Sequence, residues 1–417
     1  MAAQTPNLLL ARCGVVAPSS IADYEAHGGF AALRRAIQAG PEWVIDQVVR
    51  SRLLGRGGAL FPMGRKWDAV RAAPGSPKYV VLNADESELG TFKDRKLLEE
   101  DPFALVEAMT IAGIAVGGTQ GYAYIRGEYA LAARRFQAAV DAARANGYLG
   151  PSVLGSSHAF DIDVRRGGGA YICGEETSLF NSMEGRRGEP RVKPPFPVTS
   201  GVFRKPTVIN NVETLANVPH IVLMGGDAFA QIGAPTFTGP KLYSISGHIR
   251  RPGVYEVAAG GTLRELLELA GGMPDGSTLQ AVLLGGAAGA FVPLDQLDAP
   301  LRPDVLGPLG LTIGSGAVMV FDTTVNMWDV THQLAEFFAE ESCGQCVPCR
   351  VGTRRQVEIL ERLTAGHGGS EDVALLQELG AVMTDASICG LGQTAASAVV
   401  SALRVFPLPA GAGGHHA

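Results

Sequence analysis

Three cysteine residues recur at two-residue intervals near the carboxyl end of a chain that otherwise contains few thiols. They are Cys343, Cys346 and Cys349, and a fourth thiol, Cys389, follows later in the sequence. A C-x-x-C-x-x-C run can bind three corners of one iron–sulfur cubane while a distant cysteine closes the fourth. The pattern therefore predicts a [4Fe-4S] cluster held by these four residues, and electron transfer as the chemistry.

Two other interpretations of the cysteines remain open at this point. Paired C-x-x-C knuckles would favour structural zinc, and the thiols could also stay reduced or form disulfides. However, the chain has six cysteines in all, which does not resemble a disulfide framework. Cys173 has no cysteine nearby in sequence, so we expect it to be a packed apolar thiol.

Length and composition are those of a large globular protein. The 417 residues predict two or three domains, and a hydrophobic fraction of 46% with 18% charged residues supplies ample core. A formal net charge of −6 with no concentrated basic face argues against nucleic acid and a membrane surface as partners. The segment Met1 to Leu10 lacks a charged region followed by a long apolar stretch, which favours a reducing cytoplasm.

One uncharged stretch, Ala108 to Ile125, just reaches the lower length limit for a transmembrane helix. Glycines at 117, 118 and 121 interrupt it. We expect instead a buried helix over Pro102 to Val116, a glycine turn, and a strand over Tyr122 to Ile125. Any membrane attachment would then be through partner subunits.

The pattern of elements changes twice along the chain. Helices alternate with short apolar strands in the first half, which predicts an α/β domain. From Lys241 to Phe321 a hairpin, a helix and further short strands predict a compact β-rich module. From Trp328 onwards helical spacing dominates, with helices expected at 352–363, 371–383 and 394–403. A glycine- and alanine-rich tail from Pro407 is expected to be disordered.

A glycine-rich loop in the first half, GRGGALFPMGRKW at 55–67, is a second candidate for chemistry. Glycines allow backbone amides to approach a phosphate or a flat ring, and Lys66 can neutralise phosphate charge. No apolar strand clearly precedes the loop, so it departs from the usual dinucleotide fingerprint. Taken alone, a flexible surface loop explains it as well.

Two neighbouring segments favour a ligand. The acidic run Asn83 to Glu88 directly follows an apolar strand, where ligands bind in open α/β sheets, and could hydrogen-bond sugar hydroxyls. A solvated acidic loop is the alternative. A second glycine stretch at 167–176 leads into an amphipathic helix, and its glutamates Glu175 and Glu176 suit a helix start, where they could be stabilising only.

Five long motifs, taken together and in order, make the chain recognisable. They are GRGGALFPMGRKW, NADESELGTFKDR, GGGAYICGEETSLFNSMEGRRGEPRVKPPFP, KPTVINNVETLANV and ESCGQCVPCRVGT. From about Gly28 to Phe406 the chain resembles the NADH-binding flavoprotein subunit of respiratory complex I. It is equally similar to the diaphorase subunits of soluble NAD-linked hydrogenases and formate dehydrogenases.

The resemblance implies an α/β fold with four parts. Residues 1–238 would form a Rossmann-like domain that binds FMN and NADH, with a helical region at its N-terminus. Residues 239–325 would form a ubiquitin-like β-grasp domain of the soluble-ligand-binding (SLBB) type. Residues 326–406 would form a helical bundle that carries the [4Fe-4S] cluster, followed by a disordered tail at 407–417.

The resemblance also implies the site residues. FMN would contact Gly55, Gly57, Lys66, Asn83, Asp85, Ser87, Gly174, Ile209, Asn210, Asn211 and Thr214. NADH would lie against Gly58, Phe61, Lys66, Glu88, Tyr171, Glu176 and Phe196. Glu86 and Glu175 are further cofactor-binding candidates, and Cys343, Cys346, Cys349 and Cys389 match the cluster ligands. Glu88, Tyr171 and Glu176 would be the catalytic residues.

The implied mechanism is mainly a positioning problem, because hydride transfer needs nicotinamide and flavin rings in contact. The flavin would then pass electrons singly to the cluster. Glu86 and Glu88, which follow the strand, are expected to tune the flavin potential and to repel the oxidised dinucleotide.

Two positions depart from the family. Leu60 replaces a glycine and Leu89 replaces a proline. Leu60 could narrow the nicotinamide pocket, or demand a negative φ where glycine is free. We therefore expect nucleotide affinity or preference to be changed and not abolished.

The assembly to which the chain belongs has three candidate answers. The sequence CGLGQTA at 389–395 and Gln345 favour the diaphorase of a soluble NAD-linked formate dehydrogenase or hydrogenase. The absence of a thioredoxin-like extension and a ferredoxin module favours respiratory complex I (NADH:quinone oxidoreductase). Leu60 alone favours a catalytically silent scaffold. A thioredoxin-like [2Fe-2S] subunit and a larger iron–sulfur or catalytic subunit are the expected partners.

Overall fold

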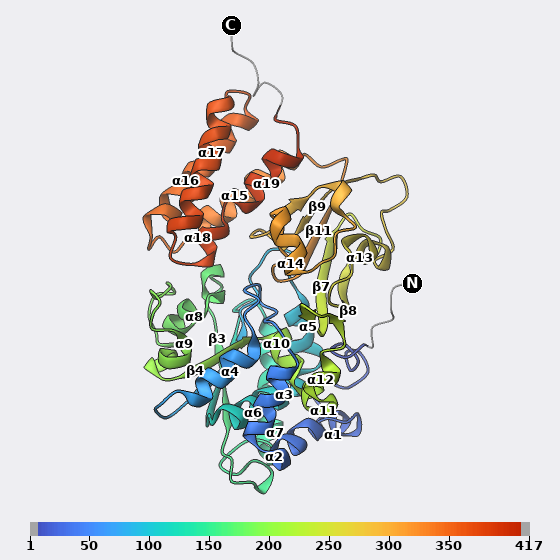
Figure 1. The fold of residues 1–417 in the computed structure, drawn as a ribbon, viewed down its shortest axis with the longest axis vertical. Helices are drawn as coiled ribbons and strands as arrows, with labels where there is room; N and C mark the ends of the chain where they lie inside the picture. Colours follow the sequence, from blue (N-terminus) through green and yellow to red (C-terminus); the bar gives the residue numbers. More distant parts are fainter. Residues whose placement is uncertain (1–6, 410–417) are drawn as a thin grey trace.

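The computed structural model describes residues 7–409 and divides into three regions that follow the chain. An α/β domain, blue to green in Figure 1, lies at one end of the molecule, and a helical bundle, orange to red, lies at the other. A β-sheet domain, yellow to orange, lies beside both. The expected fold class, α/β with a β-grasp domain and a C-terminal helical bundle, is confirmed.

The α/β domain is built on a four-stranded sheet with the order β3-β2-β1-β4, and all neighbouring strands are parallel. The chain runs from β1 to β2 and β3 on one side and then crosses from β3 to β4 on the other side of β1, which creates a topological switch point between β1 and β4. The strands are β1 (Tyr79–Ala84), β2 (Gln120–Ile125), β3 (Asp161–Arg166) and β4 (Thr207–Asn211).

Helices surround this sheet. The stretch from Ala31 to Leu53 has helical spacing in the sequence and forms two helices, because Gly40 has a φ of 87° and Pro41 begins a new helix. The helices are α1 (Ile21–Ala26), α2 (Ala31–Ala39), α3 (Pro41–Arg50), α4 (Met63–Ala72), α5 (Lys93–Glu100), α6 (Pro102–Val116), α7 (Ala130–Ala145), α8 (Glu176–Met183), α9 (Pro197–Ser200), α10 (Val212–Ala216), α11 (Val218–Met224) and α12 (Gly226–Phe229).

The uncharged stretch is the centre of the domain. All residues of α6 are buried, and β2 follows it after a turn at Gly117, which has a φ of 74°. The one acidic residue of α6, Glu107, accepts hydrogen bonds from the Tyr24 hydroxyl at 2.5 Å and from the Phe30 amide at 2.9 Å. The expected buried helix is therefore confirmed. Within residues 7–409 no helix combines the length and apolarity needed to cross a bilayer.

The second domain is a five-stranded sheet with the order β10-β9-β11-β7-β8 and one helix packed on it. The hairpin expected after Lys241 is present as the antiparallel pair β7 and β8. Its helix α13 (Leu263–Leu269) begins with a capping box between Thr262 and Glu265. The strands are β7 (Pro240–Gly247), β8 (Gly253–Ala258), β9 (Leu279–Leu284), β10 (Ala290–Val292) and β11 (Ala317–Asp322); β5 (Gly233–Ala234) and β6 (Phe237–Thr238) form a small hairpin before them, and α14 (Pro303–Leu306) follows β10.

The third region contains the helices α15 (Met327–Glu341), α16 (Val347–Thr364), α17 (Ser370–Ala386), α18 (Gly390–Thr394) and α19 (Ser397–Val405). Helix α16 begins at Val347 and not at Gly352 as the sequence suggested. The reason is Pro348, which lies in the first turn, where proline is favourable because its missing N–H has no helical partner. Cys349 therefore lies on the helix and not in a loop before it.

The expected disordered tail begins with described residues. The carbonyl of Pro407 accepts a hydrogen bond from the indole of Trp328 at 2.8 Å, which holds this part of the segment against α15. Residues 410–417 of the predicted tail lie outside the described residues.

Candidate functional site

The carboxyl ends of β1 and β4 lie side by side, and Asn83 of β1 is in register with Asn211 of β4. This edge is the switch point of the sheet, where open α/β folds form a ligand-binding crevice. The acidic run 83–88 continues directly from β1, and α10 continues from β4. Two predicted FMN-binding segments that are far apart in sequence therefore meet at one edge.

The segment 171–174, a short 3-10 helix before α8, packs against the end of β1. The Asn83 side-chain amide donates to the carbonyl of Gly174 at 2.9 Å. A Cβ placed on Gly174 would lie 3.4 Å from the carbonyl oxygen of Asp85, so a larger residue would begin to fill this gap. The absence of a side chain at Gly174 keeps the backbone of the acidic run accessible.

Asp85 offers a hydrogen-bond acceptor to a ligand. Its side chain is buried, and one carboxylate oxygen, Oδ2, accepts from the Ser87 hydroxyl at 2.8 Å. The other oxygen, Oδ1, is buried and has no hydrogen-bond partner among the described residues. Burial raises the pKa of Asp85 to about 7. A buried acceptor without a partner is costly, and a sugar-alcohol hydroxyl of FMN would satisfy it.

The glycine-rich loop is held beside these segments by its backbone. The amide of Gly55 donates to the carbonyl of Phe61 at 2.9 Å, and the amide of Arg56 donates to the Thr214 hydroxyl at 2.8 Å. A Cβ on Gly57 would lie 3.1 Å from the Cβ of Asn211, so any side chain here would push the two segments apart. These contacts fit a cradle for a flat cofactor.

Lys66 contacts both a predicted FMN residue, Ile209, and a predicted dinucleotide residue, Glu176. Its ammonium group lies 3.1 Å from the carbonyl of Ile209 and 3.5 Å from Glu176 Oε2, and a second cation, Lys193, lies 2.7 Å from Glu176 Oε1. Burial alone would raise the pKa of Glu176, but Lys66 and Lys193 outweigh it and lower the pKa. Lys193 also lies 3.0 Å from Glu175 Oε1, so the two lysines balance the charge of the two glutamates. Their ammonium groups are the donors that a phosphate would use here.

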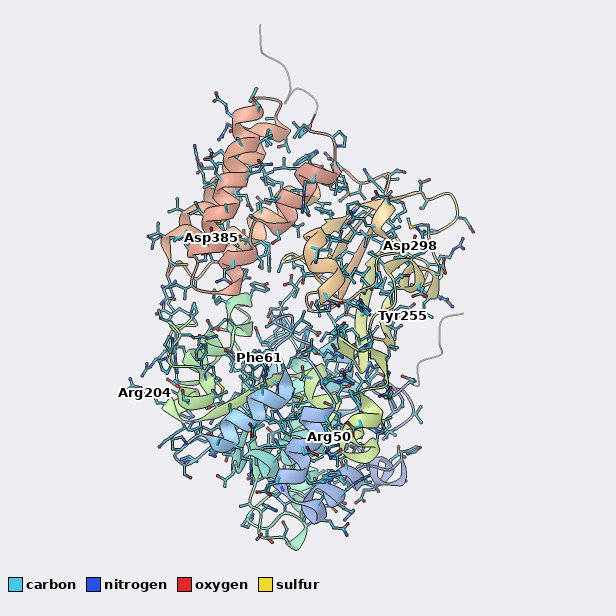
Figure 2. The ribbon with its side chains drawn as sticks, viewed as in Figure 1. Arg50, Phe61, Arg204, Tyr255, Asp298 and Asp385 are labelled. Carbon is cyan, nitrogen blue, oxygen red and sulfur yellow. The ribbon has the colours of Figure 1, made fainter. Side chains whose placement is uncertain are left out.

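Two exposed aromatic rings, Phe61 and Phe196, belong to the segments that carry Lys66 and Lys193. Phe61 is 50% exposed and Phe196 is 56% exposed, which is unusual for large apolar side chains. The Lys66 ammonium lies 5.9 Å from the centre of the Phe61 ring. Figure 2 shows Phe61 in the region between α4 and the helical bundle. Gly58, the remaining predicted nucleotide contact of the loop, has a φ of 115° that only glycine adopts readily.

The carboxylates of Glu86 and Glu175 accept hydrogen bonds from backbone amides at the first turns of helices. Both oxygens of Glu86 accept from backbone amides, those of Asp94 at 2.8 Å and Arg95 at 2.9 Å. Glu175 caps α8 through the amide of Thr177 at 2.8 Å. Burial and nearby Asp94 raise the pKa of Glu86 to about 7. These contacts give the two glutamates a role in holding the loops, and their direct contact with a cofactor stays a prediction.

Glu88 and Tyr171 connect the predicted nicotinamide site to the other two domains. The Tyr171 hydroxyl donates to Glu88 Oε2 at 2.8 Å, and the amide of Ala288 in the β-sheet domain lies 3.3 Å from Glu88 Oε1. The Tyr171 amide donates to Glu341 at the end of α15 at 3.0 Å, and its ring meets that of Phe337 edge-on at 5.0 Å. Burial raises the pKa of Glu88.

The β4 segment uses its side chains mainly to shape the site. Asn210 accepts from the indole of Trp67 at 2.9 Å. Asn211 caps α10 by accepting from the Glu213 amide at 2.9 Å, and its own amide donates to Asp94 at 2.6 Å. Two of the predicted FMN contacts are therefore fixed by neighbouring helices: Asn210 by α4 and Asn211 by α5.

The four predicted cluster cysteines belong to neighbouring elements: Cys343 and Cys346 lie between α15 and α16, Cys349 lies on α16, and Cys389 precedes α18. Figure 1 shows α18 at the end of the bundle next to the α/β domain. Cys349 is buried, and its sulfur lies 3.2 Å from the Ser342 hydroxyl. Burial raises the pKa of Cys389 to about 11, and bound iron would lower it because metal ligands must be deprotonated. Arg187 of the α/β domain donates to the carbonyl of Cys343 at 2.6 Å.

A cubane places different demands on its ligands than a single ion. Across residues 7–409, no group of three or more His, Cys, Asp or Glu side chains converges on one metal-ion position. In a [4Fe-4S] cluster each thiolate binds a different iron, so the four sulfurs lie farther apart than around one zinc ion.

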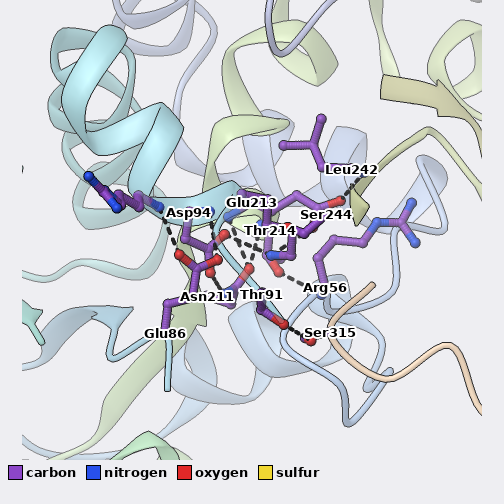
Figure 3. Close-up of polar contacts among 12 residues, drawn as sticks. Arg56, Glu86, Thr91, Asp94, Asn211, Glu213, Thr214, Leu242, Ser244 and Ser315 are labelled. Carbon is purple, nitrogen blue, oxygen red and sulfur yellow. Dashed lines mark hydrogen bonds and ion pairs between the residues drawn. The ribbon is translucent and has the colours of Figure 1, made fainter. Parts of the chain in front are cut away.

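Several charged residues that the sequence analysis did not select form a buried network next to Asn211, and Figure 3 shows three of them, Arg56, Asp94 and Glu213. Its centre is Glu213, which has ion pairs with Lys93 at 2.9 Å and Lys241 at 2.8 Å. Lysines and glutamates are seldom fully buried unless they are paired. The available signal was a single lysine within the apolar strand that begins at Pro240 and a single glutamate in the apolar run VETLANV.

The backbone conformation of Leu60 differs from the negative φ that the sequence analysis considered. Its φ is 54°, so it keeps the left-handed conformation natural to glycine and does not force a negative φ. A non-glycine residue in this region costs about 1–2 kcal/mol. The side chain packs against the hydrophobic core of the β-sheet domain, and this contact compensates for the strain.

Comparison with known protein families agrees with this geometry. Residues 48–220 match the Nuo51 FMN-binding domain, residues 242–287 match the SLBB domain, and residues 329–410 match the NADH-ubiquinone oxidoreductase-F iron-sulfur binding region. The NADH-quinone oxidoreductase F subunit 2 of Rhizobium meliloti is 46% identical over 93% of this chain and 92% of its own length. The chain belongs to the family of NADH-quinone oxidoreductase F subunits. The expected resemblance, FMN and the [4Fe-4S] region are thereby confirmed.

Other members and solved structures extend the comparison. The NADP-reducing hydrogenase subunit HndC of Solidesulfovibrio fructosivorans is 44% identical over 94% of this chain and 80% of its own length. An NAD+-reducing [NiFe]-hydrogenase in the H2-reduced state superposes with a TM-score of 0.81 at 37% identity over 87% of this chain. The chain spans 61% of that hydrogenase chain, and 65% of the corresponding chain in the air-oxidised state.

The assignment of the cluster ligands is testable by replacing the most distant one. We expect Cys389→Ala to lose iron and acid-labile sulfide while FMN is retained, because the flavin segments lie in another domain. Iron, sulfide and flavin content of the anaerobically purified protein are the measurements. Cys13→Ala is the control, since burial raises the pKa of this thiol to about 12 and it lies on the α/β domain. A full cubane spectrum in Cys389→Ala would exclude Cys389 as a ligand.

Leu60 has two effects that substitutions can separate: the strain of its left-handed backbone conformation, and the packing of its side chain on the β-sheet domain. We expect Leu60→Ala to raise the KM for NADH about fivefold, because it removes an apolar contact of about 1 kcal/mol and keeps the left-handed strain. Leu60→Gly removes the contact and the strain together, so its effect on KM should be smaller. Steady-state kinetics with NADH test both variants, and unchanged KM and kcat in both would show that Leu60 has no such role.

Proposed function

We propose that this chain exchanges a hydride between NAD(H) and FMN and relays single electrons to or from its [4Fe-4S] cluster. The observation that carries the proposal is the convergence of the predicted flavin and nucleotide segments at the β1 and β4 edge, with Tyr171 joining this edge to α15. Helix α15 ends at Glu341, two residues before the first cluster cysteine, Cys343. Such a short connection suits electron transfer between the two centres.

The residues of the site would bind and orient the two ring systems. Lys66 and Lys193 would donate hydrogen bonds to the dinucleotide phosphates, and Phe61 and Phe196 would supply ring faces for stacking. Asp85 Oδ1 would accept a hydroxyl of FMN. When bound, FMN accepts a hydride and releases electrons one at a time. The protein's contribution is positioning, because hydride transfer requires contact between the rings.

The exposed surface near the cluster supports a protein partner for the electrons. Val347 is 58% exposed and Val351 is 53% exposed on the first turns of α16, and Ile388 adjoins Cys389. Exposed apolar residues around a redox centre are typical of a docking surface. The expected partners, a thioredoxin-like [2Fe-2S] subunit and a larger iron–sulfur or catalytic subunit, belong to this proposal.

We propose that the assembly is a cytoplasmic NAD-linked hydrogenase or formate dehydrogenase of the diaphorase-containing type. The similarity to HndC and to the NAD+-reducing hydrogenase supports the hydrogenase branch. The sequence CGLGQTA at 389–395 and Gln345 support the same group.

Respiratory complex I is the second candidate. The observation in its favour is length coverage, because the chain spans 93% of the NADH-quinone oxidoreductase F subunit of Aquifex aeolicus and 92% of that of Rhizobium meliloti. Affinity purification of the tagged full chain from its native cell separates the two. A hydrogenase or formate dehydrogenase subunit in the eluate supports the soluble assembly, whereas quinone-reducing membrane subunits support complex I.

The proposed activity is testable on the purified chain. After anaerobic reconstitution with FMN, iron and sulfide, we expect NADH to reduce ferricyanide in many turnovers per flavin, because the site is complete within one polypeptide. The flavin-free protein is the control. A catalytically silent scaffold would bind FMN and the cluster and still give no reduction above that control.

Glu88 tests the predicted discrimination between the two nucleotide oxidation states. We expect Glu88→Gln to weaken the preference for NADH over NAD+ several-fold, because the substitution removes a buried negative charge and keeps the side-chain shape. The measurements are the KM for NADH and the inhibition constant of NAD+. Tyr171→Phe, which removes only the hydroxyl that donates to Glu88, should shift both constants in the same direction. Wild-type values for both nucleotides in Glu88→Gln would contradict the hypothesis.

A further inference from the structure

Lys241 is the second residue of β7, in the SLBB domain, and its side chain is fully buried. Its ammonium group lies 2.8 Å from Glu213 Oε2, 2.7 Å from the carbonyl of Leu242 and 3.0 Å from the carbonyl of Ser315. These three acceptors match the three protons of an ammonium group. Burial lowers the pKa of Lys241 to about 7, while Glu213 raises it; the acceptor set favours the charged form.

Glu213 carries this contact into the flavin domain. It lies on α10, directly after β4, and has no exposed surface. One oxygen accepts from the Leu242 amide at 2.8 Å, and the other is shared by Lys241 and Lys93. Burial would raise the pKa of Glu213, but Lys241, Lys93 and Arg56 outweigh it and lower the pKa, so the carboxylate is ionised. Figure 3 shows Glu213 between two of its hydrogen-bond partners, Asn211 and Leu242.

The network then reaches a predicted FMN contact. Lys93 lies 2.7 Å from Asp94 Oδ1, and Asp94 Oδ2 accepts from the Asn211 side chain at 2.6 Å. Asn211 in turn lies against Gly57 of the glycine-rich loop. A continuous chain of buried polar contacts therefore runs from the SLBB strand β7 to the flavin crevice.

The other two flavin segments are also attached to the SLBB domain. The glycine-rich loop packs its Leu60 side chain on the SLBB core. The segment after β1 places Glu88 against the amide of Ala288, and farther on the Phe92 amide donates to the Ser244 hydroxyl at 3.0 Å. Each of the three segments that meet at the β1 and β4 edge thus has its own contact with the SLBB sheet or its loops.

We propose that the SLBB domain of this chain positions the FMN site, and that Lys241 is the positioning residue, acting through Glu213, Lys93 and Asp94 on Asn211. The inference uses the FMN-binding domain and does not depend on NADH oxidation. Without the Lys241 ammonium, Lys93 is the one cation among the described residues that still forms ion pairs with Glu213 and Asp94 in this buried environment, and Arg56 acts on Glu213 only from a longer distance. Two buried carboxylates then share one ammonium group, and an incompletely paired charge in a buried environment is strongly destabilising.

The test compares FMN affinity in the full chain with its cluster. We expect Lys241→Met to weaken FMN binding about tenfold or more, measured by the quenching of FMN fluorescence on titration. The double variant Lys241→Met with Glu213→Gln removes the charge on both sides, so its affinity should recover toward the wild-type value. A double-mutant cycle isolates this pair from general effects of either substitution. Arg264→Met is the matched control, since it removes a cation from an exposed ion pair with Asp298 in the same domain.

The outcomes are distinct. Weaker FMN binding in Lys241→Met with unchanged iron content, recovery in the double variant and no effect of Arg264→Met support the proposal. Wild-type FMN affinity in Lys241→Met overturns it. If Lys241→Met does not fold, the double variant decides: wild-type-like affinity supports the coupling, and affinity as weak as that of Glu213→Gln alone overturns it. Wild-type protein that binds FMN without oxidising NADH would contradict the proposed function and leave this test intact.

Discussion

The parallel pairing of β1 with β4 is the constraint on which the rest of this protein depends. It brings the carboxyl ends of two strands, far apart in sequence, to one edge of the sheet, and the register matches Asn83 to Asn211. Everything that follows either strand must then share the same small volume. The glycines at positions 57 and 174 make this possible, because a side chain at either position would meet Asn211 or Asp85. The crevice is therefore a result of topology first and of side-chain chemistry second.

The second physical requirement is that charges removed from water be paired. Lys93, Glu213 and Lys241 are buried to the same degree as the hydrophobic core, and an unpaired ion in such an environment is strongly unfavourable. Their mutual contacts cross a domain boundary, because the carboxylate that pairs with Lys241 of the SLBB domain is Glu213 of the flavin domain, where Glu213 and Asp94 share Lys93. This arrangement specifies one relative orientation of the two domains, because most other orientations would leave an ion without a partner.

Much of the fold and of the cluster site could be predicted from the sequence, since both depend on local patterns. The cysteine spacing identified the iron–sulfur region, and the apolar run at 102–116 identified the buried helix α6. The individual flavin and nucleotide contacts rested on resemblance and stay predictions. The network around Glu213 was beyond sequence analysis because its partners are not neighbours: Glu213 and Lys241 are separated by 28 positions, and Arg56 and Thr214 by 158. The expectation for Leu60 was partly wrong because its φ is decided by a contact with another domain and not by its own preference.

Tyr171 has a consequence for the molecule as a whole. Its hydroxyl binds Glu88 beside the predicted nicotinamide position, and its amide binds Glu341 at the end of α15. A dinucleotide bound against Tyr171 would also restrain the bundle, and by thermodynamic reciprocity a neighbouring protein that holds the bundle would favour the same position of the tyrosine. Assembly into a larger complex and retention of the nucleotide would then be coupled.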